Sequence, residues 1–444
     1  MAATPIYDFL RQYRDSGISR LHMPGHKGNF PPLNLELLSA LDITEIQGAD
    51  SLFECSGILR QAEEYAAKLY RSARTLYSAG GSTLCIQTML AMARSRGNTI
   101  ILARNSHKAA VNAMALLGLE PVWLYPHKLD GTVFPGVITP EQVRRALEEH
   151  PDAAAVYLTS PDYFGVLCDI HGIQAQCRRF GVPLLVDNAH GAHLCVMDGL
   201  HPIAQGADLC CDSVHKTLPA LTGAALLHIG NSAFLPGAKE TMSLFGSTSP
   251  SYLVMLSIEL ALNWLEAEGA DAFRQLALRT KRLETMFQAQ GFQTPNAYQR
   301  DSTRIALDTL CGGYSGPEFA SLLRAAKLEP EYISDGAAVL LTSPFNSEED
   351  FARLGRFAAS LSPRRPIRSL SPVLPVPERA MSIREAVLSP FELVEIGRAC
   401  GRICADARIS CPPGVPVIVP GERLDKKIMN ILKMYGINDI KVVK

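Results

Sequence analysis

The sequence predicts an α/β fold, in which a large domain holds a mostly parallel sheet between two layers of helices and a smaller α+β domain follows. Short apolar stretches that suit buried strands alternate with stretches of helical periodicity, the pattern typical of such a sheet. The chain has 444 residues, more than one hydrophobic core usually serves. Hydrophobic residues make up 47% and charged residues 20%, which is a globular composition.

Residues 1–45 are predicted to form an N-terminal arm. A short amphipathic helix is expected first, followed by LHMPGHKGNFPP, which is too rich in glycine and proline for regular structure. Two interpretations of this loop stay open. It packs against a partner subunit, or it lines the mouth of a site with His22, His26 or Lys27.

The large domain is predicted to span residues 46–292. Thr139 and Pro140 mark one helix start, as the N-cap and the first helical residue. Helices are expected at 57–70, 82–96, 107–118, 139–150, 170–181, 253–269 and 271–291, and strands at 74–79, 98–104, 121–126, 153–160, 182–190, 207–213 and 223–229.

The smaller domain is predicted to span residues 293–444. Strands are expected at 304–310 and 337–343, and helices at 316–327 and 347–361. A proline-rich link follows, and the basic C-terminus is expected to form a solvated helix and a last strand.

Bulk composition excludes several classes of partner. The net charge is −1 and the pI about 6.8, so neither nucleic acid nor an anionic membrane surface is an expected partner. No run of about 18 apolar residues suggests a membrane span, and the N-terminus lacks the pattern of a secretory signal. The 11 cysteines are scattered through apolar stretches, which indicates reduced thiols in a cytoplasmic protein.

In sheets of this kind, ligands bind at the carboxyl ends of the strands, so the residues that follow each strand deserve comparison. The first such junction is AGGST, where Ser82 and Thr83 open a helix after two glycines. Free N–H groups at a helix start, with hydroxyls beside them, can bind a phosphate. The alternative is a capped helix after a glycine turn.

Three further strand ends carry ionisable side chains. His107 follows one strand, Asp187 ends another with His190 three residues later, and Ser213, His215 and Lys216 follow a third. A buried carboxylate such as Asp187 needs a partner. A metal held by His190 and His193 is conceivable, but no third ligand is evident and no metal is predicted.

One ligand needs this whole set of groups, namely pyridoxal 5′-phosphate (PLP). Its aldehyde bonds to a lysine amine, its protonated ring nitrogen needs an anionic partner, and its phosphate needs N–H and hydroxyl groups. Lys216 is therefore the candidate Schiff-base lysine. Asp187 lies one strand–helix–strand step earlier, so both residues are expected to face one cleft.

The chain also resembles a known family almost from end to end. The resemblance is carried by TPIYDFL, HMPGHKG, DITEIQGADSLFE, RNSHKA, TSPDYFG, LVDNAHGAH, DSVHKTLPALTG, GSTSPSY and PPGVPVIVPGE, in this order. These motifs are similar to those of the short-form bacterial ornithine/lysine/arginine decarboxylases, which are fold-type-I PLP enzymes with an aspartate-aminotransferase-like large domain.

The resemblance implies a role for each matching residue. Lys216 would bond the cofactor, Asp187 would hold its ring nitrogen, His107 would stack on the ring and His190 would lie near the ring oxygen. Phosphate would be bound by Ser82, Thr83, Ser213 and His215, and by Ser247 and Thr248 reaching into the neighbouring subunit of a homodimer. Assembly of such dimers into a higher oligomer stays open. Glu422 would lie near the substrate.

The implied reaction is decarboxylation of a basic L-amino acid, with arginine favoured over lysine and ornithine. A proton donor, His215 or the freed Lys216, would complete the amine product. Glu422, Asp50 and Glu54 are the candidate carboxylates for the distal cation of the substrate. The sequence departs from the family pattern at Gly80 and Cys411, which bears on substrate fit. An aminotransferase or lyase on the same scaffold and a non-catalytic homologue remain alternatives.

Overall fold

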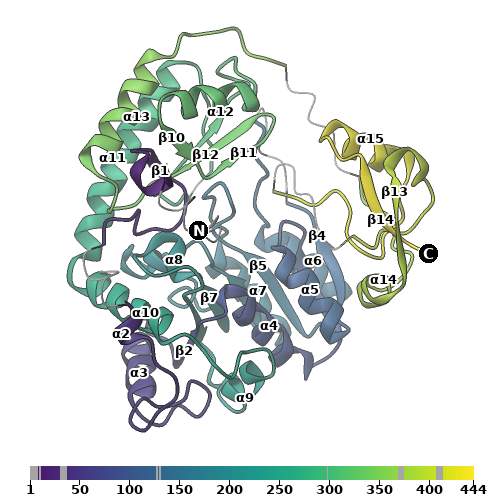
Figure 1. Cartoon of the computed structure of the whole chain (residues 1–444). Coiled ribbons are helices and arrows are strands. Elements are labelled where there is room, and N and C mark those ends of the chain that lie inside the picture. Colours follow the sequence, from purple (N-terminus) through teal and green to yellow (C-terminus); the bar gives the residue numbers. More distant parts are fainter. Residues whose placement is uncertain are drawn as a thin grey trace, which may run out of the picture.

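The computed structural model describes residues 9, 12–30, 38–126, 129, 132–297, 299–368, 375–406 and 414–444. Its centre is a seven-stranded sheet (Figure 1). In spatial order the strands are β2 (Arg74–Ser78), β8 (Ala225–Ile229), β7 (Leu209–Asp212), β6 (Leu184–Asp187), β5 (Ala155–Thr159), β3 (Thr99–Ala103) and β4 (Glu120–Leu124). The TPIYDFL motif lies almost wholly outside the described residues, and so does Cys411.

The predicted mostly parallel sheet is confirmed. β8 pairs antiparallel with both of its neighbours, β2 and β7, while the other pairings are parallel. β2 therefore runs in the same direction as the parallel strands. The carboxyl ends of these six strands meet at one edge of the sheet, where the sequence places its candidate site residues.

Helices cover both faces of this sheet, as predicted. α4, α5 and α9 share one hydrophobic cluster with the sheet, which includes Met89 and Met114. α6 and α7 pack together on a second cluster, which includes Val143 and Ile173. The helices of this domain are α3 (Ile58–Tyr70), α4 (Gly81–Arg94), α5 (Lys108–Leu117), α6 (Pro140–Glu149), α7 (Ile170–Phe180), α8 (Val214–Thr217), α9 (Ala238–Ser243), α10 (Tyr252–Trp264) and α11 (Ala270–Ala289).

Two of these helices show why the sequence patterns were informative. Thr139 caps α6, and its hydroxyl and the Gln142 side chain form a reciprocal capping box, so the predicted helix start is confirmed. α10 and α11 are joined by a π-helical turn at Leu265–Gly269, which links the two long helices expected from the periodicity.

The chain then builds a three-stranded antiparallel sheet in the order β11 (Tyr332–Ile333), β12 (Ala337–Leu341) and β9 (Arg304–Asp308). α11, α12 (Gly316–Ala325) and α13 (Glu348–Ser360) share its hydrophobic cluster. The arm contributes an unexpected strand here, because β1 (Ser19–Leu21) pairs in parallel with β10 (Leu328–Pro330) and buries Leu21 in the same cluster.

The C-terminal residues have a hydrophobic cluster of their own, which includes Ile428 and Val442. This unit contains β13 (Phe391–Glu395), α15 (Lys426–Met434) and β14 (Asp439–Val443), while α14 (Ile383–Leu388) packs against α5. Figure 1 shows these yellow elements beside α5 and β4, apart from the green three-stranded sheet. The predicted boundaries at residues 45 and 292 remain predictions.

No helix among the described residues is long and apolar enough to cross a membrane. The ten cysteines that the structure describes are all unpaired, and seven of these thiols are buried.

Candidate active site

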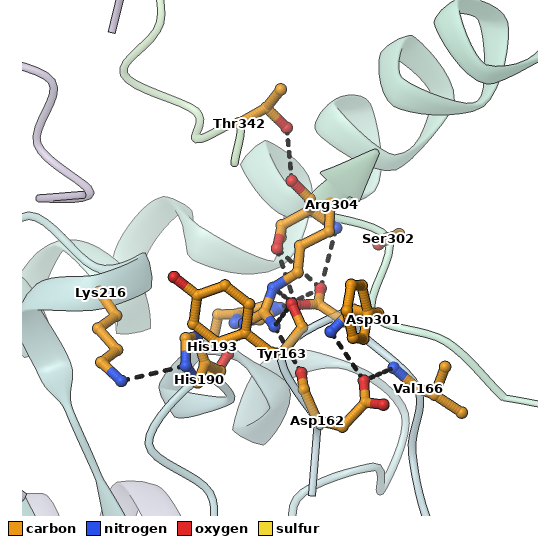
Figure 2. A network of polar contacts seen from close by, with 12 residues as sticks. Asp162, Tyr163, Val166, His190, His193, Lys216, Asp301, Ser302, Arg304 and Thr342 are labelled. Carbon is orange, nitrogen blue, oxygen red and sulfur yellow. Dashed lines mark hydrogen bonds and ion pairs between the residues drawn. The ribbon is translucent and has the colours of Figure 1, made fainter. Parts of the chain in front are cut away.

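Lys216 lies in α8, the short helix that begins directly after β7. Its side chain points toward His190, and Lys216 Nζ lies 3.1 Å from His190 Nε2 (Figure 2). His190 follows β6, the next strand of the sheet, and its ring packs edge-on against Tyr163. The ends of two neighbouring strands thus bring an amine and an imidazole together.

The surroundings of Lys216 lower the pKa of its amine and so favour the neutral form. Burial is the largest cause and lowers the pKa of Lys216, although the Asp187 carboxylate acts in the opposite direction. Burial and the nearby Lys216 charge also hold the pKa of His190 well below its usual value. A neutral amine is the nucleophilic form of lysine, which is the form that bonds to an aldehyde.

Asp187 is the last residue of β6 and is 2% exposed. The backbone N–H of Ala189 donates to Oδ1 at 3.1 Å, and the Tyr157 hydroxyl donates to Oδ2 at 3.3 Å. These donors and the Cys211 thiol, whose Sγ lies 3.7 Å from Oδ1, are all neutral, so within the described residues the carboxylate accepts hydrogen bonds from neutral groups and forms no ion pair. A buried carboxylate in this state suits a cationic partner such as a protonated ring nitrogen.

His107 caps α5, and its Nδ1 accepts a hydrogen bond from the backbone N–H of Ala109 at 3.2 Å. Part of the ring is exposed, yet desolvation is the largest cause that lowers the pKa of His107. The Asp187 carboxylate raises this pKa and the Lys216 ammonium lowers it, so His107 lies within electrostatic reach of both.

The residues predicted to bind the phosphate lie at the starts of two helices and in one loop. α4 begins at Gly81 with a φ of +68°, and no side chain caps it, so Ser82 and Thr83 lie in a helix turn without a side-chain partner for its N–H groups. His215 Nδ1 donates a hydrogen bond to the Ala224 carbonyl oxygen, 3.0 Å away.

Ser247 and Thr248 are exposed in the loop between α9 and α10. Their predicted contact with a neighbouring subunit remains a prediction.

Buried polar atoms with no partner among the described residues occur at both ends of α8 and on His190, which contacts Lys216. Within the described part of the chain, the buried atoms Ser213 Oγ, Thr217 Oγ1 and His190 Nδ1 have no hydrogen-bond partner. Buried polar groups are almost always paired, so this concentration beside one amine indicates a polar ligand. Together with the charge of Asp187 and the open start of α4, it fits the ring, aldehyde and phosphate of PLP.

Several residues of the site were missed at the sequence level. Arg304 is a buried residue of β9, and its guanidinium donates to the carbonyls of Asp162, at 2.7 Å, and of His190, at 3.3 Å (Figure 2). It ties the three-stranded sheet to the segment that carries His190. The only signal was an arginine at the start of an apolar strand.

His193 is already engaged by a carboxylate. Its Nε2 lies 3.0 Å from Asp301 Oδ1 (Figure 2). Its ring stacks on Phe273. His193 therefore already has a polar partner, and this partner is a carboxylate of the same chain.

Glu422 forms a buried, bidentate ion pair with Arg104. The two Arg104–Glu422 contacts measure 2.6 and 2.8 Å, and the backbone N–H of Val419 donates to Oε2 at 2.8 Å. The Arg104 guanidinium also lies over the Trp123 ring, 4.7 Å from its centroid. The predicted substrate role of Glu422 remains a prediction, but its charge is already balanced in this structure.

The other two candidate carboxylates are placed less favourably for a substrate. Asp50 accepts backbone hydrogen bonds from Ser51, Ser56, Gly57 and Leu59, and so caps the start of α3. Glu54 is exposed in the turn that precedes this helix.

We expect Glu422→Gln to lower the free energy of unfolding by about 3–5 kcal/mol, because it leaves the buried Arg104 charge uncompensated. Urea unfolding measures this loss. Glu378→Gln is the matched control, since Glu378 pairs with Arg423 at the surface and should change stability by less than about 1 kcal/mol. Equal effects of the two substitutions would contradict a stabilising buried pair.

The fold and this site together define a fold-type-I PLP enzyme. The solved structure of Escherichia coli constitutive lysine decarboxylase matches the whole chain and 82% of its own with a TM-score of 0.76 at 18% identity. Lysine decarboxylase A from Pseudomonas aeruginosa matches 99% of this chain and 82% of its own with a TM-score of 0.75 at 16% identity. At these identities, the structural matches establish the fold.

The sequence comparisons establish the family. A family model described as Orn/Lys/Arg decarboxylase, major domain, matches residues 4–289, and the model of the C-terminal domain matches residues 370–439. The arginine decarboxylase of Bacillus subtilis is 31% identical, covering 94% of this chain and 91% of its own. The uncharacterized protein YaaO of the same organism is 30% identical, covering 96% and 92%.

The chain therefore belongs to the Orn/Lys/Arg decarboxylase family, and the resemblance drawn from the sequence motifs is confirmed. It is a PLP-dependent amino-acid decarboxylase acting on a basic amino acid.

Proposed function

We propose that this protein decarboxylates L-arginine, with lysine and ornithine as the next candidates, using PLP. The observation that carries the site assignment is the Lys216–His190 contact at the sheet edge that also holds Asp187. The preference for arginine is supported by the relatives that match nearly end to end, two of which are the arginine decarboxylases of Bacillus subtilis and Bacillus anthracis.

When bound, PLP supplies an electron sink for the pair of electrons that the departing carboxylate leaves behind. Lys216 would hold the aldehyde carbon, and the burial that lowers its pKa favours the neutral, nucleophilic amine. Asp187 would keep a proton on the ring nitrogen. His107 would cover one ring face, and the starts of α4 and α8 would hold the phosphate through Ser82, Thr83, Ser213 and His215.

The substrate also needs a proton at its α-carbon after CO₂ leaves. Lys216 and His215 are the candidate donors, and they are neighbours in α8. Burial lowers the pKa of both groups, so this effect favours neither donor over the other.

We further propose a cytoplasmic homodimer whose two sites lie at the subunit interface, with Ser247 and Thr248 completing the neighbour's phosphate site. The exposure of both side chains and the unpaired thiols of the described cysteines support this proposal. The amine product would enter polyamine synthesis.

The test is CO₂ release from purified, PLP-loaded protein given L-arginine, L-lysine or L-ornithine separately, without a keto acid. Release from arginine at the highest kcat/KM is the expected result. Release from lysine or ornithine alone would replace the proposed substrate. Turnover only when a keto acid is added would instead indicate an aminotransferase.

We propose Glu331 as the carboxylate that binds the distal cation of the substrate. Tyr163 donates its hydroxyl to Glu331 Oε1 at 2.8 Å, and the Tyr163 ring lies 5.3 Å from the His190 ring. Glu331 is thus one aromatic side chain away from the Lys216–His190 pair. Its second oxygen accepts the backbone N–H of Met23, so both of these donors are neutral.

We expect Glu331→Gln to raise KM for arginine about 10- to 100-fold with a smaller change in kcat, because a hydrogen bond between charged groups is lost. Steady-state kinetics of CO₂ release measure both constants. Glu329→Gln is the matched control. Glu329 lies two residues before Glu331 in the chain and pairs with Arg324 at the surface. An unchanged KM in Glu331→Gln would exclude this role.

A further inference from the structure

The HMPGHKG motif lies next to the helix that carries Lys216. We define its residues 22–28 as the arm loop. Gly25 N–H donates to the carbonyl oxygen of His215 at 2.9 Å, so the loop contacts the residue that directly precedes Lys216. This contact is made within one chain and does not depend on a second subunit.

Only glycine fits at position 25. A Cβ there would lie 2.7 Å from the carbonyl carbon of Thr217 and 2.8 Å from the carbonyl oxygen of Leu218, whereas ordinary contacts begin at 3.4 Å. Both atoms belong to backbone rather than to a flexible side chain, so a side chain at 25 would have to move the backbone that follows Lys216.

The arm loop is fixed on its other side by the three-stranded sheet and its neighbours. Lys27 is 4% exposed, and its ammonium donates to the carbonyls of His22, at 2.7 Å, and of Leu341, at 2.9 Å. The Ser343 hydroxyl donates to the carbonyl of Gly25. The backbone N–H of Met23 donates to Glu331 at 2.9 Å. The loop is thus held at three places beyond α8.

We propose that the arm loop is a positioning element that sets the place of Lys216 relative to its ring partners. The arm loop is hydrogen-bonded to α8 through Gly25, and to Leu341 of β12 and to Ser343 on its other side. A shift of β12 would therefore move α8 as well. This proposal rests on the assignment of Lys216 as the cofactor lysine, and it gives Gly25 and Ser343 a role in the reaction without contact with the substrate.

The test compares Gly25→Ala with Gly355→Ala in PLP-loaded protein. Gly355 lies in α13, where an added Cβ would meet nothing closer than 3.9 Å, so it controls for the substitution itself. The readouts are the visible absorbance of the lysine-bound cofactor, titrated against pH, and kcat and KM measured separately.

We expect Gly25→Ala to shift the pH midpoint of the cofactor absorbance by about one unit and to lower kcat about 100-fold, since small misplacements of a reacting group are this costly. Gly355→Ala should match the wild type. Ser343→Ala removes one hydrogen bond to the arm loop and should shift the pH midpoint of the cofactor absorbance in the same direction as Gly25→Ala, but by less. It is the variant to measure if Gly25→Ala does not fold.

An unchanged midpoint and kcat in folded Gly25→Ala, or in Ser343→Ala where the first variant fails to fold, would overturn the positioning role. A purely structural role would lower the melting temperature alone. If the wild type itself showed no lysine-bound cofactor absorbance, the site assignment would be wrong instead, so the two failures are distinguishable.

Discussion

Lys216→Ala is expected to lose the visible absorbance of lysine-bound PLP and to lower kcat by about 1,000-fold or more. The Lys216 amine contacts His190 and lies within electrostatic reach of Asp187. The methyl side chain of alanine cannot bond to the cofactor aldehyde, so the variant lacks this covalent link. Absorbance spectra and CO₂ release from the same preparation measure both effects. Lys427→Ala, an exposed lysine of α15, controls for the loss of a charge.

If Lys216→Ala kept the absorbance and the activity, another lysine would hold the cofactor. The two other lysines to examine are Lys27 and Lys239, which are both buried. Lys27 donates to two carbonyls and Lys239 pairs with Glu63, so neither amine is available without breaking these contacts.

Asp187→Asn is expected to lower kcat about 100- to 1,000-fold while the protein still binds PLP. Asparagine keeps the shape of the side chain, and its carbonyl oxygen still accepts the N–H of Ala189. It lacks the negative charge that would hold a proton on the ring nitrogen, and preorganised charges of this kind are usually the largest catalytic contribution.

The measurement for Asp187→Asn is PLP content by absorbance against kcat in the same preparation. Loss of both in proportion would indicate that Asp187 only retains the cofactor. Loss of neither would remove Asp187 from the catalytic site. Restoration of activity is not expected from added PLP, because the defect lies in the charge and not in occupancy.

The sequence was sufficient for the parts of the site that follow strands. Periodicity locates β6 and β7, and because parallel strands end at one edge of the sheet, the sequence predicts that Asp187, His190 and Lys216 lie close together. These residues are close in the chain to elements with strong hydrophobic patterns. Their individual roles remain predictions.

Contacts between distant segments could not be predicted in this way. Arg304 reaches the site from β9 and Glu331 from the position between β10 and β11, both more than 80 residues beyond Lys216, and no periodicity marks them. The pairing of Arg104 with Glu422 joins residues 318 positions apart. Such pairs depend on how whole units pack, which local patterns do not specify.

The arm shows the same limit. Its glycines and prolines predicted irregular structure, but not that β1 would enter the cluster of the three-stranded sheet or that Gly25 would lie on the backbone of α8. Close approach of two backbones requires glycine, yet a glycine in a loop is equally typical of a turn.

The assignment of Lys216 as the cofactor lysine is tested most directly by reducing the PLP-loaded protein with borohydride and locating the pyridoxyl mass by peptide mapping. We expect the label on the peptide that contains Lys216 and none on the peptides that contain Lys27 and Lys239. A label on either of these lysines, or none on Lys216 in protein that releases CO₂, would contradict this assignment.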